Sequence, residues 1–226
     1  TAGVEYSSDG ILFERVRTRT RIFESGENLG EPFVQYSADL RGLSSNTEYV
    51  YRIVVNGEPV SLNASGFVTS GPGSFRFLVL GDSGEGSSGQ VQLAQQVSRE
   101  RPSLVLHAGD LAYYDGSFQQ FRANYFDRYP IMRRVPFFPA PGNHEYLSAD
   151  AAPYRALHSV PSVNVPESDW GRYYSFDWSN VHFVSLDSNV SLERSAVGEG
   201  VMLMGLEDGL GDARQVLLVG FFQHPP

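Results

Sequence analysis

The 226-residue sequence contains no cysteine, and this absence removes several classes of protein at once. Disulfide scaffolds, thiolate zinc sites, iron–sulfur clusters and cysteine nucleophiles all need a thiol. Basic residues are also few, with 17 Lys plus Arg against 26 Asp plus Glu and a formal net charge of -9. Because nucleic-acid binding depends on neutralising phosphates, we expect no DNA or RNA partner.

Long apolar runs are missing as well. No stretch reaches the length of a membrane span, and no signal peptide opens the sequence, so we expect no membrane contact. The first residues already follow a strand pattern, and we therefore expect the natural chain to begin further upstream. Hydrophobic residues make up 41% of the chain and aromatic residues 13%, which is enough for a packed core and excludes disorder.

The first seventy residues predict an all-β region. The segment "FERVRTRTRIF" (13–23) alternates, with Val16, Thr18, Thr20 and Ile22 on one face and the four arginines from 15 to 21 on the other. An arginine row can bind anions, but we interpret this one as the solvated face of a strand. Further alternating runs cover 33–43 and 47–57, and Asn56-Gly57 predicts a two-residue hairpin turn.

The segment "LSSNTEY" (43–49) carries a more specific pattern. Leu43, Thr47 and Tyr49 resemble the corner between strands E and F of fibronectin type III domains, where the tyrosine hydroxyl bonds to the backbone upstream. The early strands of such a domain are missing from the sequence. We therefore predict a partial fibronectin type III-like domain over 1–70, joined to the next region by Gly71-Pro72-Gly73.

From residue 74 the pattern changes to that of an α/β sandwich, which we predict over 74–226. Apolar strands are predicted over 75–80, 103–107 and 135–139, with a helix from Ser87 or Ser88 that Pro102 stops. Phe118, Phe121, Tyr125 and Tyr129 form one apolar stripe of a second predicted helix. The remaining predictions are a hairpin that turns at Ser179-Asn180, a helix over 201–213 and a last buried strand over 215–226.

Polar residues follow these apolar strands at each point where a strand ends. They are Asp82, Asp110, the pair Asn143-His144, and His224. In open α/β sheets the ends of neighbouring strands meet in one crevice, so four distant segments are expected to place their side chains together. Carboxylate, amide and imidazole groups are metal ligands, and carboxylates favour hard cations. Tyr113 lies three residues after Asp110, so one helical turn would direct both side chains the same way, although Tyr114 is an alternative.

Four blocks of the chain, in this order, resemble the calcineurin-like metallophosphoesterases: Gly81-Asp82, Gly109-Asp110-Leu111-Ala112-Tyr113, Gly142-Asn143-His144-Glu145 and His224. The tyrosine three residues after the second aspartate is similar to that of the purple acid phosphatases, a family that commonly carries a fibronectin-like domain before the catalytic one. The resemblance implies a secreted or periplasmic enzyme that hydrolyses phosphate monoesters with a metal-bridging hydroxide.

The resemblance also implies a role for each residue. Asp82 and Tyr113 would bind ferric iron, Asp110 would bridge two metals, and Asn143 and His224 would bind a divalent zinc, manganese or iron ion. His144 would orient the phosphate and protonate the leaving oxygen. A small phosphate ester would be the substrate, while the oligomeric state is not indicated.

Two alternatives remain open. A phosphodiesterase or nucleotide hydrolase of the same superfamily is one, although such relatives usually lack the phenolate ligand. The other is a non-catalytic extracellular binding module, because the Gly-His-x-His block of the family does not occur before the sequence stops at Pro226. We expect that block to lie downstream in the natural protein.

The other histidines carry weaker signals. We predict structural roles for His107 and His182, and we assign no role to His158. Ser83, Ser87 and Ser88 could form a phosphate-cradling loop, but a helix N-cap at Ser87 or Ser88 is the favoured interpretation.

Overall fold

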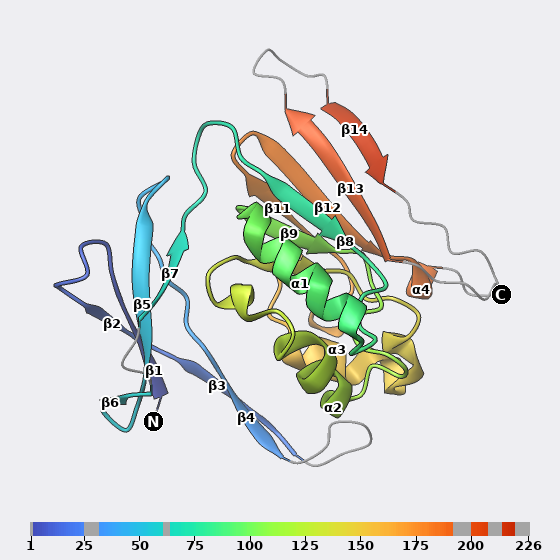
Figure 1. The fold of residues 1–226 in the computed structure, drawn as a ribbon, viewed down its shortest axis with the longest axis horizontal. Coiled ribbons are helices and arrows are strands. Elements are labelled where there is room, and N and C mark those ends of the chain that lie inside the picture. The colour runs from blue at the N-terminus through green and yellow to red at the C-terminus, as the bar shows by residue number, and fades with distance from the viewer. Residues whose placement is uncertain (1, 25–31, 61–63, 192–199, 208–213, 220–226) are drawn as a thin grey trace.

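The computed structural model describes residues 2–24, 32–60, 64–191, 200–207 and 214–219. The described part of the N-terminal region consists of short strands: β1 (Ala2–Ser7), β2 (Glu14–Arg17), β3 (Arg19–Phe23), β4 (Phe33–Ser37), β5 (Glu48–Val55), β6 (Glu58–Pro59) and β7 (Ser65–Val68). One antiparallel sheet has the order β2-β1-β5-β6, with β7 also paired to β5. Strands β3 and β4 form a separate ribbon that reaches toward the helices of the next region (Figure 1).

The strand predicted over 13–23 is divided at Thr18. Strand β2 pairs with β1, whereas β3 pairs with β4, and the Thr18 hydroxyl donates to the Ala2 carbonyl at 2.9 Å where the chain changes sheet. Ile22, predicted to lie on the inner face, is 66% exposed because β3 has left the sheet that would cover it. The alternating pattern therefore predicted the strands correctly but not their separation.

Two local predictions for this region are confirmed. The Tyr49 hydroxyl accepts a hydrogen bond from the Ser44 amide at 3.0 Å, as the tyrosine-corner pattern predicted. Asn56 and Gly57 have φ values of 52° and 93° and connect β5 to β6, which is the backbone of a type I′ turn. The assignment of residues 1–70 to the fibronectin type III class, and the division between two domains near residue 70, stay predictions.

The second region contains two sheets and short helices. The strands are β8 (Phe77–Leu80), β9 (Leu104–His107), β10 (Phe137–Pro139), β11 (Tyr174–Trp178), β12 (Val181–Asp187), β13 (Gly200–Glu207) and β14 (Arg214–Val219). The helices are α1 (Ser88–Glu100), α2 (Phe118–Gln120), η1 (Phe121–Phe126), η2 (Pro130–Arg133), η3 (Glu145–Leu147), η4 (Ala149–Ala151), α3 (Ala152–Leu157), η5 (Glu167–Asp169) and α4 (Ser188–Ser191). None of the helices in the described ranges has the length and apolarity needed to cross a membrane.

The two sheets pack face to face, which confirms the predicted α/β architecture. Strands β10, β9 and β8 form a parallel sheet, and β11, β12, β13 and β14 form an antiparallel one. Leu104 and Leu106 of the first sheet pack in one buried cluster with Val181 and Phe183 of the second. A packed apolar layer of this kind holds the parallel strands rigidly, so the loops at their ends start from fixed positions.

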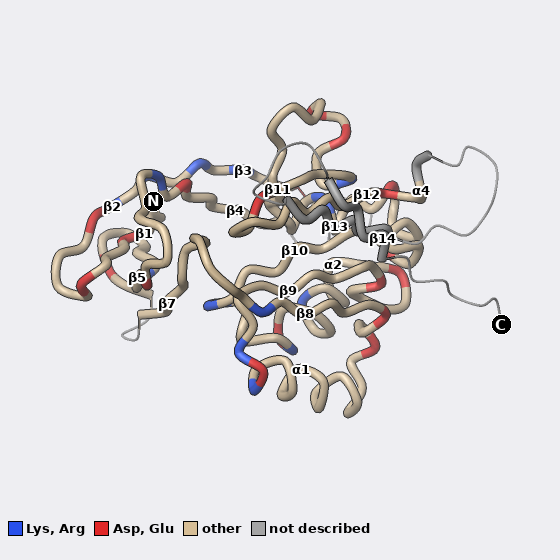
Figure 2. The backbone as a smooth tube through the Cα atoms, turned by 90° about the horizontal axis from the view of Figure 1, so that it is seen from above, with Lys and Arg blue, Asp and Glu red and all other residues tan. Residues whose placement is uncertain are grey.

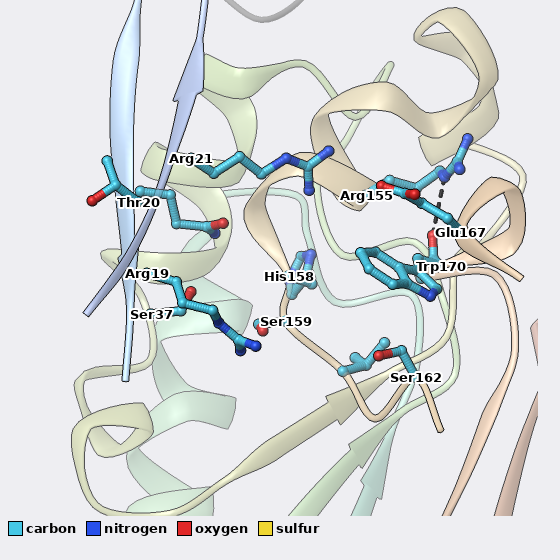
Figure 3. Close-up of a pocket in the computed structure, with 13 residues that line it drawn as sticks. Arg19, Thr20, Arg21, Ser37, Arg155, His158, Ser159, Ser162, Glu167 and Trp170 are labelled. Carbon is cyan, nitrogen blue, oxygen red and sulfur yellow. Dashed lines mark hydrogen bonds between the residues drawn. The ribbon is translucent and has the colours of Figure 1, made fainter. Parts of the chain in front are cut away.

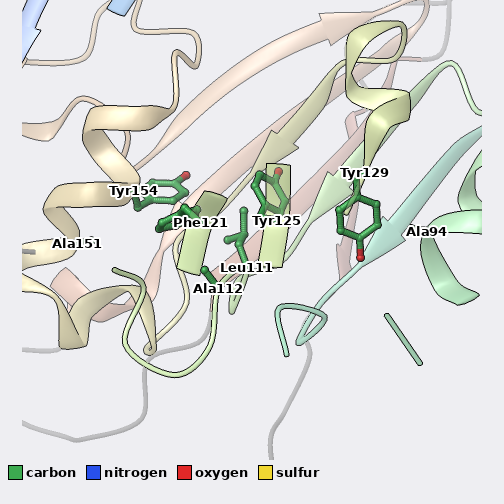
Figure 4. Close-up of a cluster of buried hydrophobic side chains, with 8 residues drawn as sticks. All are labelled: Ala94, Leu111, Ala112, Phe121, Tyr125, Tyr129, Ala151 and Tyr154. Carbon is green, nitrogen blue, oxygen red and sulfur yellow. The ribbon is translucent and has the colours of Figure 1, made fainter. Parts of the chain in front are cut away.

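A second buried cluster joins the parallel sheet to its helices. Figure 4 shows its members: Ala94, Leu111, Ala112, Phe121, Tyr125, Tyr129, Ala151 and Tyr154. Three residues of the predicted aromatic stripe are buried here, while Phe118 instead contacts Phe33 of β4 with ring centroids 4.9 Å apart. The stripe is carried by a short α-helix that continues as the π-helical turn η1, so the predicted helix exists with a different winding.

Helix α1 begins and ends where its sequence signals predicted. The Ser87 hydroxyl accepts from the Gln90 amide at 3.3 Å, which confirms the N-cap, and Arg101 at φ 48° ends the helix just before Pro102. The turn of the β11–β12 hairpin lies at Ser179-Asn180, again as predicted.

The helix predicted over 201–213 is wrong for residues 201–207, and residues 208–213 lie outside the described part of the chain. Residues 200–207 form strand β13, which pairs antiparallel with β12 from Val181↔Leu206 to Asp187↔Gly200. The segment is apolar in every phase, so its periodicity does not separate helix from strand, and the unpaired edge of β12 decides the outcome. The predicted last strand is present as β14 (Arg214–Val219).

Candidate metal centre

The candidate site lies at the C-terminal edge of the parallel sheet. Strands β8, β9 and β10 are neighbours and end at Leu80, His107 and Pro139, and a short loop follows each one. Asp82 and Asp110 lie on the first two loops, and the third carries Asn143 and His144. Parallel neighbours deliver such loops to one edge, so the predicted convergence has a direct structural basis.

Tyr113 joins the two aspartates of the site. Its hydroxyl donates to Asp82 Oδ1 at 2.9 Å and to Asp110 Oδ2 at 3.0 Å. The neighbouring Tyr114 is 80% exposed, and Tyr113 is the tyrosine that reaches both carboxylates. The structure thus brings three of the predicted metal ligands into direct contact.

His144 lies against the same cluster. Its backbone amide donates to Asp110 Oδ1 at 3.1 Å, and its ring centroid is 4.4 Å from that of Tyr113. The Nδ1 atom lies 2.5 Å from the Tyr114 carbonyl oxygen and therefore carries the proton of that hydrogen bond. The other ring nitrogen, Nε2, lies 4.0 Å from Asp110 Oδ2 and therefore faces the carboxylate cluster.

Of the two remaining predicted ligands, Asn143 and His224, the structure describes only Asn143. Asn143 is half-buried on the loop between Gly142 and His144, both of which approach Asp110. His224 lies outside the described residues. Within the part of the chain that the structure describes, no three His, Cys, Asp or Glu side chains form a group that could hold a metal ion. Two of the predicted ligands, Tyr113 and Asn143, are of other residue types.

Glycines allow the three loops to touch at the backbone. A Cβ atom on Gly84 would lie 2.2 Å from the Leu111 carbonyl oxygen, because the loop after β8 crosses the loop after β9 there. A Cβ on Gly109 would lie 2.7 Å from Gly142 Cα, where the loops after β9 and β10 meet. Contacts this short exclude any other residue without movement of the backbone.

Both aspartates have a left-handed backbone, with φ 51° at Asp82 and φ 55° at Asp110. This region costs an ordinary residue about 1–3 kcal/mol, and aspartate is among those that tolerate it best. The turn at each position follows directly after a buried strand and directs the carboxylate toward the same edge of the sheet.

Glu145 holds two of the loops together, and its role was missed from sequence. It is 0% exposed, and its carboxylate accepts four backbone N–H groups. Oε2 accepts from Asp110 at 2.9 Å and from Gly142 at 2.7 Å, while Oε1 accepts from Leu111 at 2.8 Å and from Ala112 at 3.3 Å. Burial and the nearby Asp110 raise the pKa of Glu145 to about 7, although these N–H groups act to lower it. A sequence signal existed, since Glu145 directly follows the predicted Asn143-His144 pair.

Burial dominates the electrostatics of the site. Burial is the main cause that raises the pKa of Asp110, and burial with the two carboxylates raises the pKa of Tyr113 above its usual value. A cation among these oxygens would reverse both effects, because it stabilises carboxylate and phenolate together. The oxygen-rich donor set therefore fits a hard metal ion.

A buried hydrogen-bond chain lies beside these residues. Ser83 Oγ is 2.8 Å from His107 Nε2 and accepts from the Tyr129 hydroxyl at 2.9 Å. Burial lowers the pKa of His107 to about 3, so its ring is neutral. Ser83 is thus committed to the interior rather than to a phosphate-cradling loop, and His107 has the structural role predicted for it. His182 pairs with Asp177 at 2.6 Å on the β11–β12 hairpin, also away from the cluster.

Comparison with known proteins agrees with this fold. The family model of the calcineurin-like phosphoesterases matches residues 75–200, and the chain belongs to that family. The structure of a purple acid phosphatase from yellow lupin (Lupinus luteus) seeds is similar with a TM-score of 0.66 and 21% identity, over 78% of this chain and 38% of that one. This likeness supports the fold.

Two curated relatives are similar in sequence. "Probable inactive purple acid phosphatase 24" of Arabidopsis thaliana is 28% identical over 171 residues, which are 63% of this chain and 28% of the relative. An uncharacterized protein of Mycobacterium tuberculosis is 27% identical over 199 residues, which are 77% of this chain and 37% of the relative. The chain thus spans between about a quarter and two fifths of the length of these proteins.

Proposed function

We propose that the protein containing this chain hydrolyses phosphate monoesters at a centre of two metal ions. The observation that supports this function best is the contact of Asp82, Asp110 and Tyr113 at the edge of the parallel sheet, with His144 beside them. Two aspartates and a phenol offer three anionic oxygens, which suit a trivalent ion such as ferric iron next to a zinc, manganese or iron(II) ion.

In this proposal Asp82 and Tyr113 would hold the ferric ion, Asn143 and His224 would hold the divalent ion, and Asp110 would serve both metals. When bound, such a pair of cations neutralises a phosphate group and acidifies water. A small phosphate ester is the proposed substrate, and a secreted or periplasmic location is part of the same proposal.

The protein residues themselves would orient the ester and manage one proton. His144 Nδ1 is fixed as a donor to the Tyr114 carbonyl, which leaves Nε2 to face the ester. A protonated Nε2 donates to a phosphate oxygen or to the departing alkoxide, and this is the general-acid role. Glu145 fixes the position of Asp110 relative to the loop that carries His144, because its carboxylate accepts hydrogen bonds from both segments.

The test is spectroscopic and uses the full-length protein loaded with iron. Tyrosinate bound to ferric iron gives a visible charge-transfer band, which we expect in the wild type and in Tyr114→Phe. Tyr113→Phe should retain iron and lose the band. A colourless wild-type protein with iron bound would contradict the proposed ligand set.

A non-catalytic role is the second candidate, because two relatives from Arabidopsis thaliana carry the name of probable inactive purple acid phosphatases. Metal binding without turnover of any phosphate ester by the full-length protein would favour it. Turnover that disappears in Asp110→Asn would favour the hydrolase.

A further inference from the structure

A cavity of about 440 Å³ lies between the β3–β4 ribbon and the segment that contains α3. Arg19 and Arg21 of β3 line one side, and Arg155 and Trp170 line the other. In Figure 3 Arg21 extends toward Arg155, Arg19 extends toward Ser159, and His158 lies between the two sides. We call this space the arginine cavity. Cavities of this volume hold small molecules in other proteins.

The two walls are joined by specific contacts. The Gln35 side-chain amide on β4 donates to the carbonyl oxygens of Ala156 and Leu157 at 3.1 and 3.3 Å. The Phe33–Phe118 ring contact adds a second connection. The change of sheet at Thr18 brings β3 to this position, so Arg19 and Arg21 line the cavity, whereas Arg15 and Arg17 on β2 do not. Arg19 and Arg21 are exposed as well, as the interpretation of the arginine row as a solvated strand face predicted.

The positive charge of the cavity is poorly compensated. Arg21 has no ion pair with any carboxylate among the described residues and lies 4.6 Å from the centre of the Phe23 ring. Arg19 pairs with Asp39 at 3.0 Å, but both side chains are largely exposed, and such pairs contribute little. Glu167 is the one carboxylate that lines the cavity within the described ranges. The chain has a net charge of -9, and Figure 2 shows basic residues on β3 as well as near β9 and α1.

Arg155 is held in place on the opposite wall. Its guanidinium donates to Asp150 at 2.9 Å and to the carbonyl oxygens of Trp170 and Ser168. Asp150 also pairs with Arg172 at 2.6 Å, so one carboxylate serves two guanidinium groups. A fixed cation on one wall and two freer cations on the other match a ligand with more than one oxyanion group, because guanidinium groups bind phosphoryl oxygens in pairs.

The neutral groups of the cavity fit the same kind of ligand. Ser37, Ser159 and Ser162 place hydroxyl donors on its lining. Burial lowers the pKa of His158 to about 4, and its Nδ1 bonds to the Tyr154 carbonyl at 2.8 Å, so the ring is neutral and the charge rests on the arginines. Trp170 is 44% exposed and offers an aromatic surface to the part of a ligand that carries the phosphates.

We propose that the arginine cavity binds a small molecule that carries at least two phosphoryl groups. None of the five candidate residues of the metal centre that the structure describes, Asp82, Asp110, Tyr113, Asn143 and His144, lines this cavity. The proposal is therefore independent of the phosphatase activity.

Pyrophosphate is the probe, and calorimetric titration is the measurement. The full-length protein is used with Asp110→Asn, which removes the predicted bridging ligand and with it hydrolysis of the probe. In this background Arg21→Gln and Arg19→Gln should each weaken pyrophosphate binding by about tenfold or more, since each removes a charged donor. Glu167→Gln should strengthen binding, because it removes a carboxylate that repels the ligand.

Arg17→Gln is the matched control, since it makes the same charge change on the adjacent strand without lining the cavity. It should alter pyrophosphate binding less than twofold by long-range charge alone. The proposal is overturned if the Asp110→Asn protein does not bind pyrophosphate, or if Arg17→Gln weakens binding as much as Arg21→Gln. Thermal unfolding should be unchanged in Arg21→Gln; if that variant fails to fold, Glu167→Gln and Arg19→Gln decide.

Discussion

Replacing Glu145 with glutamine tests the connection between the two ligand loops. The change keeps the size of the side chain, removes its charge and turns one acceptor oxygen into an NH₂ group. Each carboxylate oxygen accepts two backbone N–H groups. In either orientation of the glutamine side chain, its NH₂ group replaces one of these oxygens and cannot accept the two hydrogen bonds made there. Two hydrogen bonds to an ionised acceptor are lost, at about 1.5–3 kcal/mol each.

The loss of these hydrogen bonds is opposed by a gain in global stability, because glutamine removes the cost of burying the Glu145 charge. Burial raises the pKa of Glu145 from 4.5 to about 7. At pH 8 the buried charge therefore costs about 3 kcal/mol, and glutamine removes that cost. The pKa of about 7 already includes the hydrogen bonds that lower it, so the free energy of unfolding of the metal-free protein should change by no more than about 3 kcal/mol in either direction.

The local effect should be much larger than the global one. In Glu145→Gln the backbone amides of 108–116 and 140–147 should exchange hydrogen at least ~10-fold faster, while those of α1 stay unchanged. Metal affinity should fall by about 10–100-fold, the usual effect of losing a group that orients ligands. Hydrogen-exchange mass spectrometry and calorimetric metal titration of the full-length protein measure the two quantities.

Tyr154→Phe is the control for this experiment. It removes a buried hydrogen bond of 2.8 Å to the Pro139 carbonyl and keeps the ring that packs in the cluster with Leu111 and Ala112. It should lower the free energy of unfolding by about 1 kcal/mol and leave metal affinity unchanged. The reasoning is refuted if Glu145→Gln leaves loop exchange and metal affinity at wild-type values, or if Tyr154→Phe reduces affinity equally.

Three further outcomes are expected. Gly84→Ala should lower the free energy of unfolding by at least about 4 kcal/mol in urea titrations, because its Cβ meets Leu111 backbone at 2.2 Å. The control Gly81→Ala, whose nearest neighbour is 3.9 Å away, should cost less than about 1 kcal/mol, and equal losses would contradict the crossing of the loops. Stability should fall from pH 6.5 toward pH 4, since the pKa values of His107 and His158 are lowered to about 3 and about 4 and the unfolded chain binds protons first. His158→Phe should remove about 1.4 kcal/mol per pH unit from that slope, and an unchanged slope would exclude this histidine. His144→Gln should reduce kcat by about 100-fold or more at unchanged metal content, whereas an unaffected kcat would remove it from proton transfer.

The parts of the site that follow from strand order were predictable from sequence. Gly-Asp or Gly-Asn after an apolar run locates the end of a buried strand, and parallel neighbours then bring Asp82, Asp110 and the Asn143-His144 pair to one edge. The three-residue spacing also selected Tyr113 over Tyr114. These inferences needed only local patterns and one rule of α/β topology.

The parts that depend on contacts between distant backbones were not predictable. Glu145 acts through four amides on two loops, and nothing in its sequence position states which amides lie within reach. The separation of β2 from β3 at Thr18 leaves the alternating pattern intact, so the pattern could not reveal it. For 201–207, an open strand edge elsewhere in the chain decided between two structures that the apolar residues fit equally well.

The contact between Gly109 and Gly142 limits how this site can diversify. Main-chain atoms, with no side chain between them, set the spacing of the second and third loops. No side chain lies between the two loops that a mutation could enlarge or shorten to change the distance between them. In the proposed enzyme, a new metal preference or a new substrate must therefore come from replacing side chains at the edge of the site, because the distance between the loops after β9 and β10 stays the same.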